Sequence, residues 1–176
     1  MIPRRRYLAH LKAVSDAIAT DTKGRALEEL VSFLFSQVPG ITIVQRNVLN
    51  AFRTEEIDVA LWNRQHPRGF YFLPHQILIE CKNWSVACGT TEVSYFSTRL
   101  ENRGCEYGIF IAINGITGDP ATLTAAHFEL STALSHGRRL IIITGDELRQ
   151  LMNTDDLIRL TEKKLCQLVA SGTIYK

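Results

Sequence analysis

The chain has 176 residues, which is enough for one domain with a sizeable core but short for two. Hydrophobic residues make up 45% and charged residues 22% of the composition, as is ordinary for a globular protein. No apolar run approaches the roughly 18 residues that a membrane-spanning helix needs. The net charge of +2 neither requires nor excludes a nucleic acid partner, because a local basic patch matters more than the sum.

The N-terminal sequence and the cysteines indicate in which cellular compartment the protein is expected. Arg4, Arg5 and Arg6 are followed by residues 7–12, which lack the continuous apolar stretch of a secretory signal, so we expect a cytoplasmic protein. No two cysteines form a C-x-x-C pair, which argues against zinc and disulfide frameworks. We therefore expect all four to be reduced: Cys81, Cys88, Cys105 and Cys166.

The first half of the chain changes its hydrophobic period from helical to alternating. Apolar residues at helical spacing predict helices over residues 4–19 and 23–38, the second ended by Pro39-Gly40. Alternating and β-branched residues then predict strands over residues 41–49, 56–62 and 76–82. Three strands in succession indicate an antiparallel meander.

The second half alternates between helix and strand. The pattern predicts, in order, a helix over 90–103, a buried strand over 107–114, a helix from Asp119-Pro120 to about 135, a strand over 140–144, and helical residues 146–170 broken near Asn153-Thr154. Asp119-Pro120 is assigned as a helix start because a capping carboxylate precedes a first-turn proline. The order predicts an α/β fold, with a mixed sheet between helices on both faces.

Three charged residues lie in two otherwise apolar strands. Glu80 and Lys82 are two residues apart in the third strand, so both side chains point to the same face. Asp58 lies in the preceding strand, between Ile57 and Val59. Burying these charges is costly unless they are paired or bound to a metal.

This set of side chains suits phosphodiester hydrolysis. Two carboxylates can hold a hard divalent cation such as Mg²⁺. The cation activates a water molecule and neutralises charge on the phosphate, and a nearby lysine can orient that water and stabilise the transition state. The alternative interpretation is a structural salt bridge between neighbouring strands.

The ordered motifs resemble the PD-(D/E)xK nuclease superfamily, and more narrowly the Mrr-type restriction endonuclease family. Lys23 to Leu30 looks like the opening helix of that family, and Glu80-Cys81-Lys82 is similar to its (Q/E)-C-K triplet. Tyr107 to Ala112 is similar to its following strand, and residues 126–143 are similar to its last core helix and strand. The resemblance covers residues 23 to about 151.

The resemblance implies a role for each matched residue. Asp58 and Glu80 would be metal ligands, the main-chain carbonyl of Cys81 would be a third ligand, and Lys82 would position the attacking water. Glu28 of the opening helix would bind or orient a metal-bound water.

Glu29 competes with Glu28 for that last role. Glu28 lies at the edge of the apolar stripe, whereas Glu29 stacks toward solvent with Ser32 and Ser36. We therefore assign the role to Glu28.

The implied protein is a single nuclease domain over residues 1–176, with an N-terminal helix (1–20), a catalytic core (21–151) and a C-terminal helix (152–176). It would be an Mg²⁺-dependent endonuclease acting on DNA, with Mn²⁺ as a substitute, in restriction or another anti-invader defence. Two alternatives are a catalytically silent nucleic-acid-binding or scaffold domain of the same fold, and a related nuclease of branched DNA or RNA.

The sequence also gives expectations about partners other than DNA. No recognisable DNA-reading module such as a helix-turn-helix is present, so a partner subunit or an oligomer would supply specificity. No membrane partner is expected. A double-strand cut needs two sites, which predicts a homodimer. Its candidate surface is the apolar C-terminal helix, with closure of the core as the alternative role of that helix.

Several other residues have two open interpretations. Trp84 and Tyr95 either stack on bases or belong to the core. Arg4 to Arg6 and Arg138-Arg139 either contact phosphates or are ordinary solvated residues. None of the five histidines is assigned to a metal.

Overall fold

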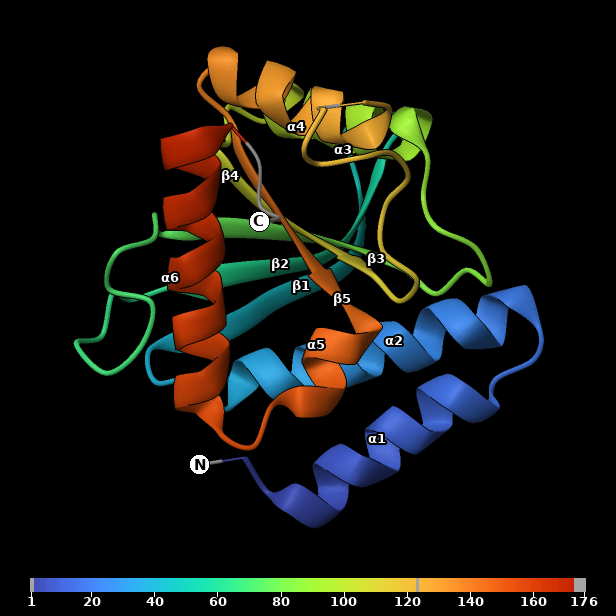
Figure 1. Ribbon diagram of the computed structural model, residues 1–176. Coiled ribbons are helices and arrows are strands. Elements are labelled where there is room, and N and C mark those ends of the chain that lie inside the picture. Colours follow the sequence, from blue (N-terminus) through green and yellow to red (C-terminus); the bar gives the residue numbers. More distant parts are fainter. Residues whose placement is uncertain (1, 123, 173–176) are drawn as a thin grey trace.

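A five-stranded mixed sheet forms the centre of the structure, with the strands in the order β1-β2-β3-β4-β5 (Figure 1). The first three strands pair antiparallel, and β4 and β5 extend the sheet by parallel pairing. This arrangement confirms the predicted meander and mixed sheet. The computed structural model describes residues 2–122 and 124–172, in which the strands are β1 (Ile41–Leu49), β2 (Glu56–Asn63), β3 (Gln76–Lys82), β4 (Tyr107–Ala112) and β5 (Arg139–Thr144).

Helices cover both faces of this sheet. In Figure 1, α3 and α4 lie above the sheet, α1 and α2 lie below it, and α6 runs in front of it. The helix α2 contacts β1, β2 and β3, α3 contacts β4, and both α4 and α6 contact β5. The helices are α1 (Arg4–Asp16), α2 (Thr20–Ser36), α3 (Thr90–Asn102), α4 (Ala126–Ser135), α5 (Gly145–Gln150) and α6 (Thr154–Ser171).

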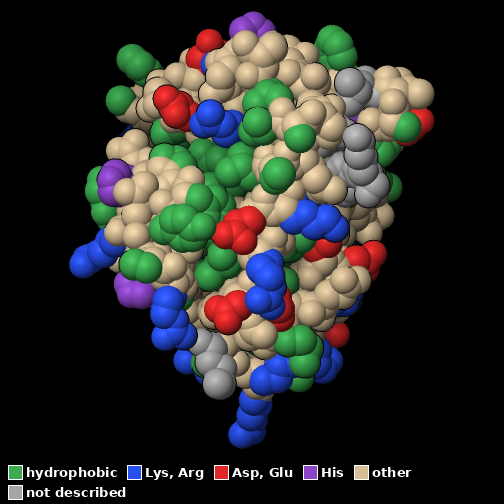
Figure 2. All heavy atoms as spheres, turned by 60° about the vertical axis from the view of Figure 1, so that its left-hand side comes forward, with side chains coloured by type: hydrophobic (Ala, Val, Ile, Leu, Met, Phe, Trp, Pro, Cys, Tyr) green, Lys and Arg blue, Asp and Glu red, His purple; other side chains and the backbone are tan. Residues whose placement is uncertain are grey.

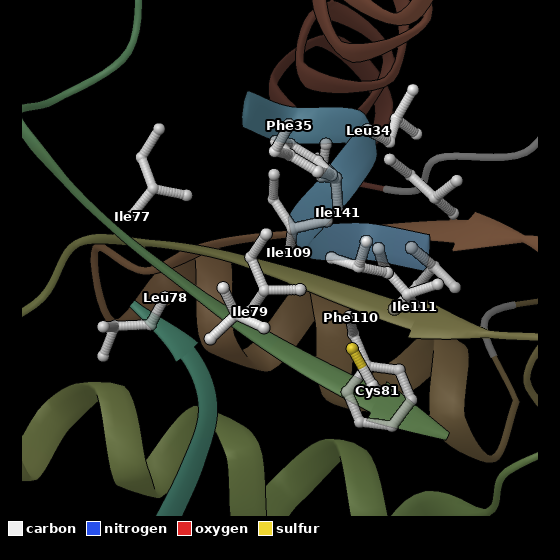
Figure 3. Close-up of a cluster of buried hydrophobic side chains, with 14 of the residues drawn as sticks. Leu34, Phe35, Ile77, Leu78, Ile79, Cys81, Ile109, Phe110, Ile111 and Ile141 are labelled. Carbon is white, nitrogen blue, oxygen red and sulfur yellow. The ribbon is translucent and has the colours of Figure 1, made fainter. Parts of the chain in front are cut away.

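The buried core lies mainly between the central strands and α2. Every residue of β4 is buried, as expected for a parallel strand covered on both faces. Successive side chains of β3 and β4 alternate between the two faces, so Phe110 points away from α2 and packs against Phe96 of α3 at 5.8 Å. Figure 3 shows the cluster on both faces, including Leu34, Phe35, Ile77, Ile79, Ile109 and Ile141.

The predicted helix start at Asp119-Pro120 is wrong. The helix α4 begins at Ala126, and Asp119 instead closes a turn. Its carboxylate accepts hydrogen bonds from the main-chain N–H of Ala121 at 2.8 Å and from the hydroxyl of Thr122 at 3.1 Å. An Asp side chain can stabilise a turn as readily as a helix start, and here the local turn is formed. The first helix is also shorter than predicted, because Ala17 is extended.

The break near Asn153-Thr154 is confirmed, and its cause is a helix cap. The side chain of Asn153 accepts a hydrogen bond from the main-chain N–H of Asp156 at 3.0 Å. The Asp156 carboxylate in turn accepts from the main-chain N–H of Asn153 at 3.1 Å, which completes a reciprocal cap. This cap starts α6 independently of α5.

The apolar residues of α6 mostly close the core. Leu157 and Leu168 are buried, whereas Val169 is 58% exposed. Three further apolar residues of α6, Ile158, Leu160 and Leu165, are partly buried and pack against the core. Figure 2 turns the left-hand side of Figure 1 forward, where acidic and basic side chains are interspersed around a region of hydrophobic side chains. The homodimer stays a prediction, because the packing of α6 already accounts for most of its apolar residues.

No helix among the described residues is both long and apolar enough to cross a membrane.

The packing of α3 on β4 depends on the absence of a side chain at Gly108. A Cβ there would lie 2.6 Å from Leu100 Cδ1 and 2.8 Å from Phe96 Cε1, closer than real contacts allow. We expect Gly108→Ala to lower the free energy of unfolding by about 1–3 kcal/mol, measured by urea denaturation. Gly24→Ala in α2 is the control, since its Cβ would meet nothing closer than 3.9 Å. Equal stability of the two variants would contradict this account.

Candidate active site

Asp58 lies where the hydrogen-bonded ladder of the sheet opens. The pairs between β2 and β3 run from Trp62↔Gln76 to Val59↔Ile79, so Asp58 and Glu80 are the next residues beyond the last pair. On the other side, the register of β1 and β2 places Asn47 opposite Asp58. Asn47 has a φ of 52°, a left-handed conformation that Asn tolerates better than most residues. The pairing of β2 with β3 therefore ends before Asp58, whereas β1 and β2 remain paired on both sides of it.

The Asp58 carboxylate takes the place of a missing ladder partner. Its Oδ2 accepts a hydrogen bond from the main-chain N–H of Cys81 at 2.6 Å. Burial and the nearby charge of Glu80 raise the pKa of Asp58 to about 7, although the Cys81 N–H and the charge of Lys82 act in the opposite direction. Within the described residues, no Lys, Arg or His forms an ion pair with Asp58. The positive charge near Asp58 is thus too small to offset its burial and the negative charge of Glu80.

Glu80, by contrast, is held by two cations. It is 2% exposed, and Arg99 Nη1 lies 2.8 Å from both of its carboxylate oxygens. Lys82 Nζ lies 2.8 Å from Oε1 of the same carboxylate. Since charged hydrogen bonds of this length are strong, the Glu80 side chain is fixed in one orientation.

Lys82 carries a stable positive charge at the edge of the site. Burial lowers the pKa of Lys82, but the charge and hydrogen bond of Glu80, with the charge of Asp58, outweigh burial and raise it above the usual value. Its Nζ also lies 5.8 Å from the centre of the Trp84 ring. Lys82 is therefore a cation in this arrangement, and it is suited to orient a water molecule or to stabilise negative charge.

The two glutamates of α2 differ as predicted in burial. The Glu28 side chain is 12% exposed and Glu29 is 56% exposed. Arg46 of β1 lies between them, with Nη2 at 3.5 Å from Glu28 Oε2 and Nη1 at 2.7 Å from Glu29 Oε1. The charge of Glu28 is the smallest of the contributions to the raised pKa of Asp58.

The Cys81 thiol is separate from this chemistry. It is buried, and burial raises its pKa well above the usual value, so the thiol stays protonated. Only the main chain of Cys81 takes part in the site, where its N–H donates to Asp58. The other three cysteines are also free thiols.

Sequence reasoning missed Arg99. It lies on α3, 19 residues after Glu80 in the chain, and no spacing rule connects the two positions. The sequence does contain one indication, because Arg99 lies next to the apolar stripe of Val93, Phe96 and Leu100. An arginine on the buried side of a helix requires a partner of opposite charge.

Several of the open residues have partners within the chain. Arg4 donates to the carbonyl of Leu151 at 2.7 Å, and Arg138 pairs with Glu101 at 3.2 Å. These contacts favour structural roles for both arginines. Trp84 and Tyr95 are 39% and 63% exposed, so neither is a core residue and both remain accessible to a substrate.

The fold and this constellation agree with a comparison against known families. A family model described as restriction endonuclease, of the Mrr catalytic type, matches residues 20–152. The chain belongs to the Mrr-type restriction endonuclease family. No curated protein sequence matches it. The family confirms the resemblance drawn from the sequence, and it identifies the mixed sheet as a restriction-endonuclease-like core.

Members of restriction-endonuclease-like families generally use divalent metals, so the fit of such an ion can be tested on the residues present. Among the described residues, no three His, Cys, Asp or Glu side chains gather at metal-ligating positions. Asp58 and Glu80 nevertheless supply two carboxylates from neighbouring strands just beyond the last β2–β3 pair, and burial and the charge of Glu80 raise the pKa of Asp58. A cation between them would remove that repulsion, and hard oxygen ligands are what Mg²⁺ prefers.

Proposed function

We propose that this restriction endonuclease domain is a metal-dependent endonuclease that hydrolyses phosphodiester bonds in DNA. The observation that carries the proposal is that Asp58, whose pKa is raised to about 7, lies next to the Glu80–Lys82 ion pair at the point where the pairing of β2 and β3 ends. A restriction or other anti-invader role is the biological setting that fits such an activity.

Each residue has a defined task in this proposal. Asp58 and Glu80 would hold the cation, and the main-chain carbonyl of Cys81 would be a further oxygen ligand. When bound, Mg²⁺ or Mn²⁺ would polarise the phosphate and lower the pKa of a water. Lys82, kept protonated by Glu80 and Asp58, orients the attacking water and stabilises charge on the phosphate. Glu28 orients water from the α2 side.

One observation favours a second candidate, a catalytically silent nucleic-acid-binding domain. Glu80 already has two cationic partners, Arg99 and Lys82, as a structural ion-pair cluster would. Among the described residues, however, no cation forms an ion pair with Asp58, and a purely structural site gains nothing from a carboxylate whose pKa is raised. Metal-dependent cleavage distinguishes the two candidates.

The proposal also covers the form of the DNA substrate and the oligomeric state of the enzyme. A site with one Asp58, Glu80 and Lys82 set cuts one strand, so cleavage of a duplex requires two chains or two binding events. A homodimer would place two sites on one duplex. Sequence specificity would come from the oligomer or from a partner subunit.

Incubation with supercoiled plasmid tests this function. We expect nicked and then linear DNA with Mg²⁺ or Mn²⁺ and intact plasmid with EDTA, resolved on agarose gels, because hydrolysis requires the cation. Parallel reactions contain single-stranded DNA, branched DNA and RNA, and sedimentation equilibrium reports the oligomeric state.

The outcomes separate the alternatives. Cleavage of RNA or branched DNA alone would replace the duplex substrate. A monomer that only nicks would reject the dimer and keep the chemistry. Binding without cleavage of any substrate would establish the silent domain.

A further inference from the structure

Arg99 contacts both carboxylate oxygens of a proposed metal ligand, and neither the family motif nor the sequence pattern assigns it a role. Its Nη1 lies 2.8 Å from both Oε1 and Oε2 of Glu80. The Arg99 side chain is 24% exposed, whereas the Glu80 side chain is 3% exposed. A partly exposed guanidinium therefore contacts both oxygens of a carboxylate that is almost fully buried.

The occupancy of the Glu80 oxygens limits what else can bind there. Each carboxylate oxygen accepts about two contacts. Arg99 uses one position on each oxygen, and Lys82 uses a second on Oε1 at 2.8 Å. A divalent cation on Glu80 thus has to share Oε2 with Arg99 or displace the guanidinium.

The backbone around Arg99 is well anchored, so its reach to Glu80 is set by the fold. Phe96 and Leu100 on the same helix are fully buried, and they pack against the position of Gly108 on β4. One turn further on, Arg103 Nη1 lies 2.6 Å from Glu55 Oε2. Two arginines at this end of α3 therefore have different partners: Arg99 pairs with a site carboxylate, and Arg103, the C-cap residue of α3, pairs with Glu55 of the β1–β2 turn.

We propose that Arg99 is a positioning residue that competes with the divalent cation for Glu80 and so sets the metal affinity of the site. The inference rests on the proposed function, because it assumes that Asp58 and Glu80 bind a cation. It goes further by naming the side chain that opposes this binding. Arg99 holds the Glu80 carboxylate beside Asp58, and its positive charge repels an incoming cation.

The test measures metal affinity, which a merely structural arginine would not change in this direction. Isothermal titration calorimetry with Mn²⁺, on chain freed of metal with EDTA and at fixed ionic strength, compares wild type with Arg99→Gln. We expect Arg99→Gln to bind Mn²⁺ roughly tenfold more tightly, because one charge next to the ligand is removed. Arg103→Gln is the matched control, since it removes the same charge from the same helix, and its affinity should stay within about twofold of wild type.

Thermal unfolding supplies a second readout. Without metal, Arg99→Gln should melt at a lower temperature than wild type, because Glu80 keeps only Lys82 as a partner. Saturating Mn²⁺ should then raise the melting temperature of Arg99→Gln by more than that of wild type or Arg103→Gln, since a tighter ligand stabilises more.

Arg99→Lys is the variant to use if Arg99→Gln does not fold. An ammonium group cannot bridge both oxygens as the guanidinium does, so this variant should bind Mn²⁺ about threefold more tightly than wild type. Equal or weaker Mn²⁺ binding by Arg99→Gln, or by Arg99→Lys in its place, would overturn the competition while leaving the nuclease proposal intact. A wild-type chain that binds no Mn²⁺ would overturn both the competition and the metal site.

Discussion

Asp58→Ala, Glu80→Ala and Lys82→Ala are each expected to lower the rate of DNA cleavage by roughly 10³-fold or more, because each removes a group that acts on the same phosphate. The measurement is the initial rate of plasmid nicking with saturating Mg²⁺. Circular dichroism confirms that each variant remains folded. Unchanged cleavage by Asp58→Ala would remove the proposed site, and nearly full activity of Lys82→Ala would remove the lysine from the mechanism.

The glutamates of α2 provide a matched pair for the same assay. Glu28 and Glu29 share Arg46 as a partner, but only Glu28 contributes to the raised pKa of Asp58. Glu28→Ala is therefore expected to slow cleavage by roughly 10- to 100-fold, as is typical of groups that support metal ligands, whereas Glu29→Ala should match wild type. Equal effects of the two substitutions would show that they act through Arg46.

The second large effect is on stability and depends on pH. The pKa of Asp58 is raised from 3.8 to about 7 in the folded chain, mainly by burial and then by the charge of Glu80. The folded state therefore binds the Asp58 proton more tightly than the unfolded state does. The contribution to stability is fully present below the unfolded pKa, and it is lost as pH rises through about 7.

Asp58→Asn removes this dependence while keeping an oxygen that can accept from the Cys81 N–H. In EDTA we expect the variant to be more stable than wild type at pH 8 by on the order of 2–4 kcal/mol, with little difference at pH 4. Urea denaturation across this pH range measures it. Added Mg²⁺ should close the gap by stabilising wild type alone.

Glu55 provides a control in which the pH dependence of stability has the opposite sign. Its pKa is lowered, first by the hydrogen bond from Arg103, so Glu55→Gln should lose stability at high pH and be neutral at low pH. Asp58→Asn that is less stable than wild type at pH 8 would contradict the electrostatic account of the site.

The elements with strong periodicity could be predicted closely from the sequence. The strand over residues 41–49 has the predicted bounds, and the second strand extends only one residue further. Asp58, Glu80 and Lys82 could be grouped because strand alternation fixes the face of each side chain.

What could not be predicted depends on contacts between distant segments. The Asp119-Pro120 dipeptide is compatible with a turn and with a helix start, and only the neighbouring Thr122 and Ala121 decide between them. The contact of Arg99 with Glu80 requires that α3 cross the sheet at one particular place, which its packing on Gly108 determines. The bond from the Cys81 N–H to Asp58 requires that two strands separate, a feature that alternation alone does not indicate.

The irregular pairing of β1 also affects how this chain behaves at high concentration. β1 is an edge strand, and its register with β2 shifts between Ile43 and Gln45, which leaves Val44 as an extra residue that is 57% exposed. A bulge of this kind twists an edge away from flat pairing, and Arg46 adds a charge to it. The open edge is therefore a poor template for adding a strand from another molecule. Association through a continuous intermolecular sheet is disfavoured, and the chain is protected at this edge against strand-driven aggregation.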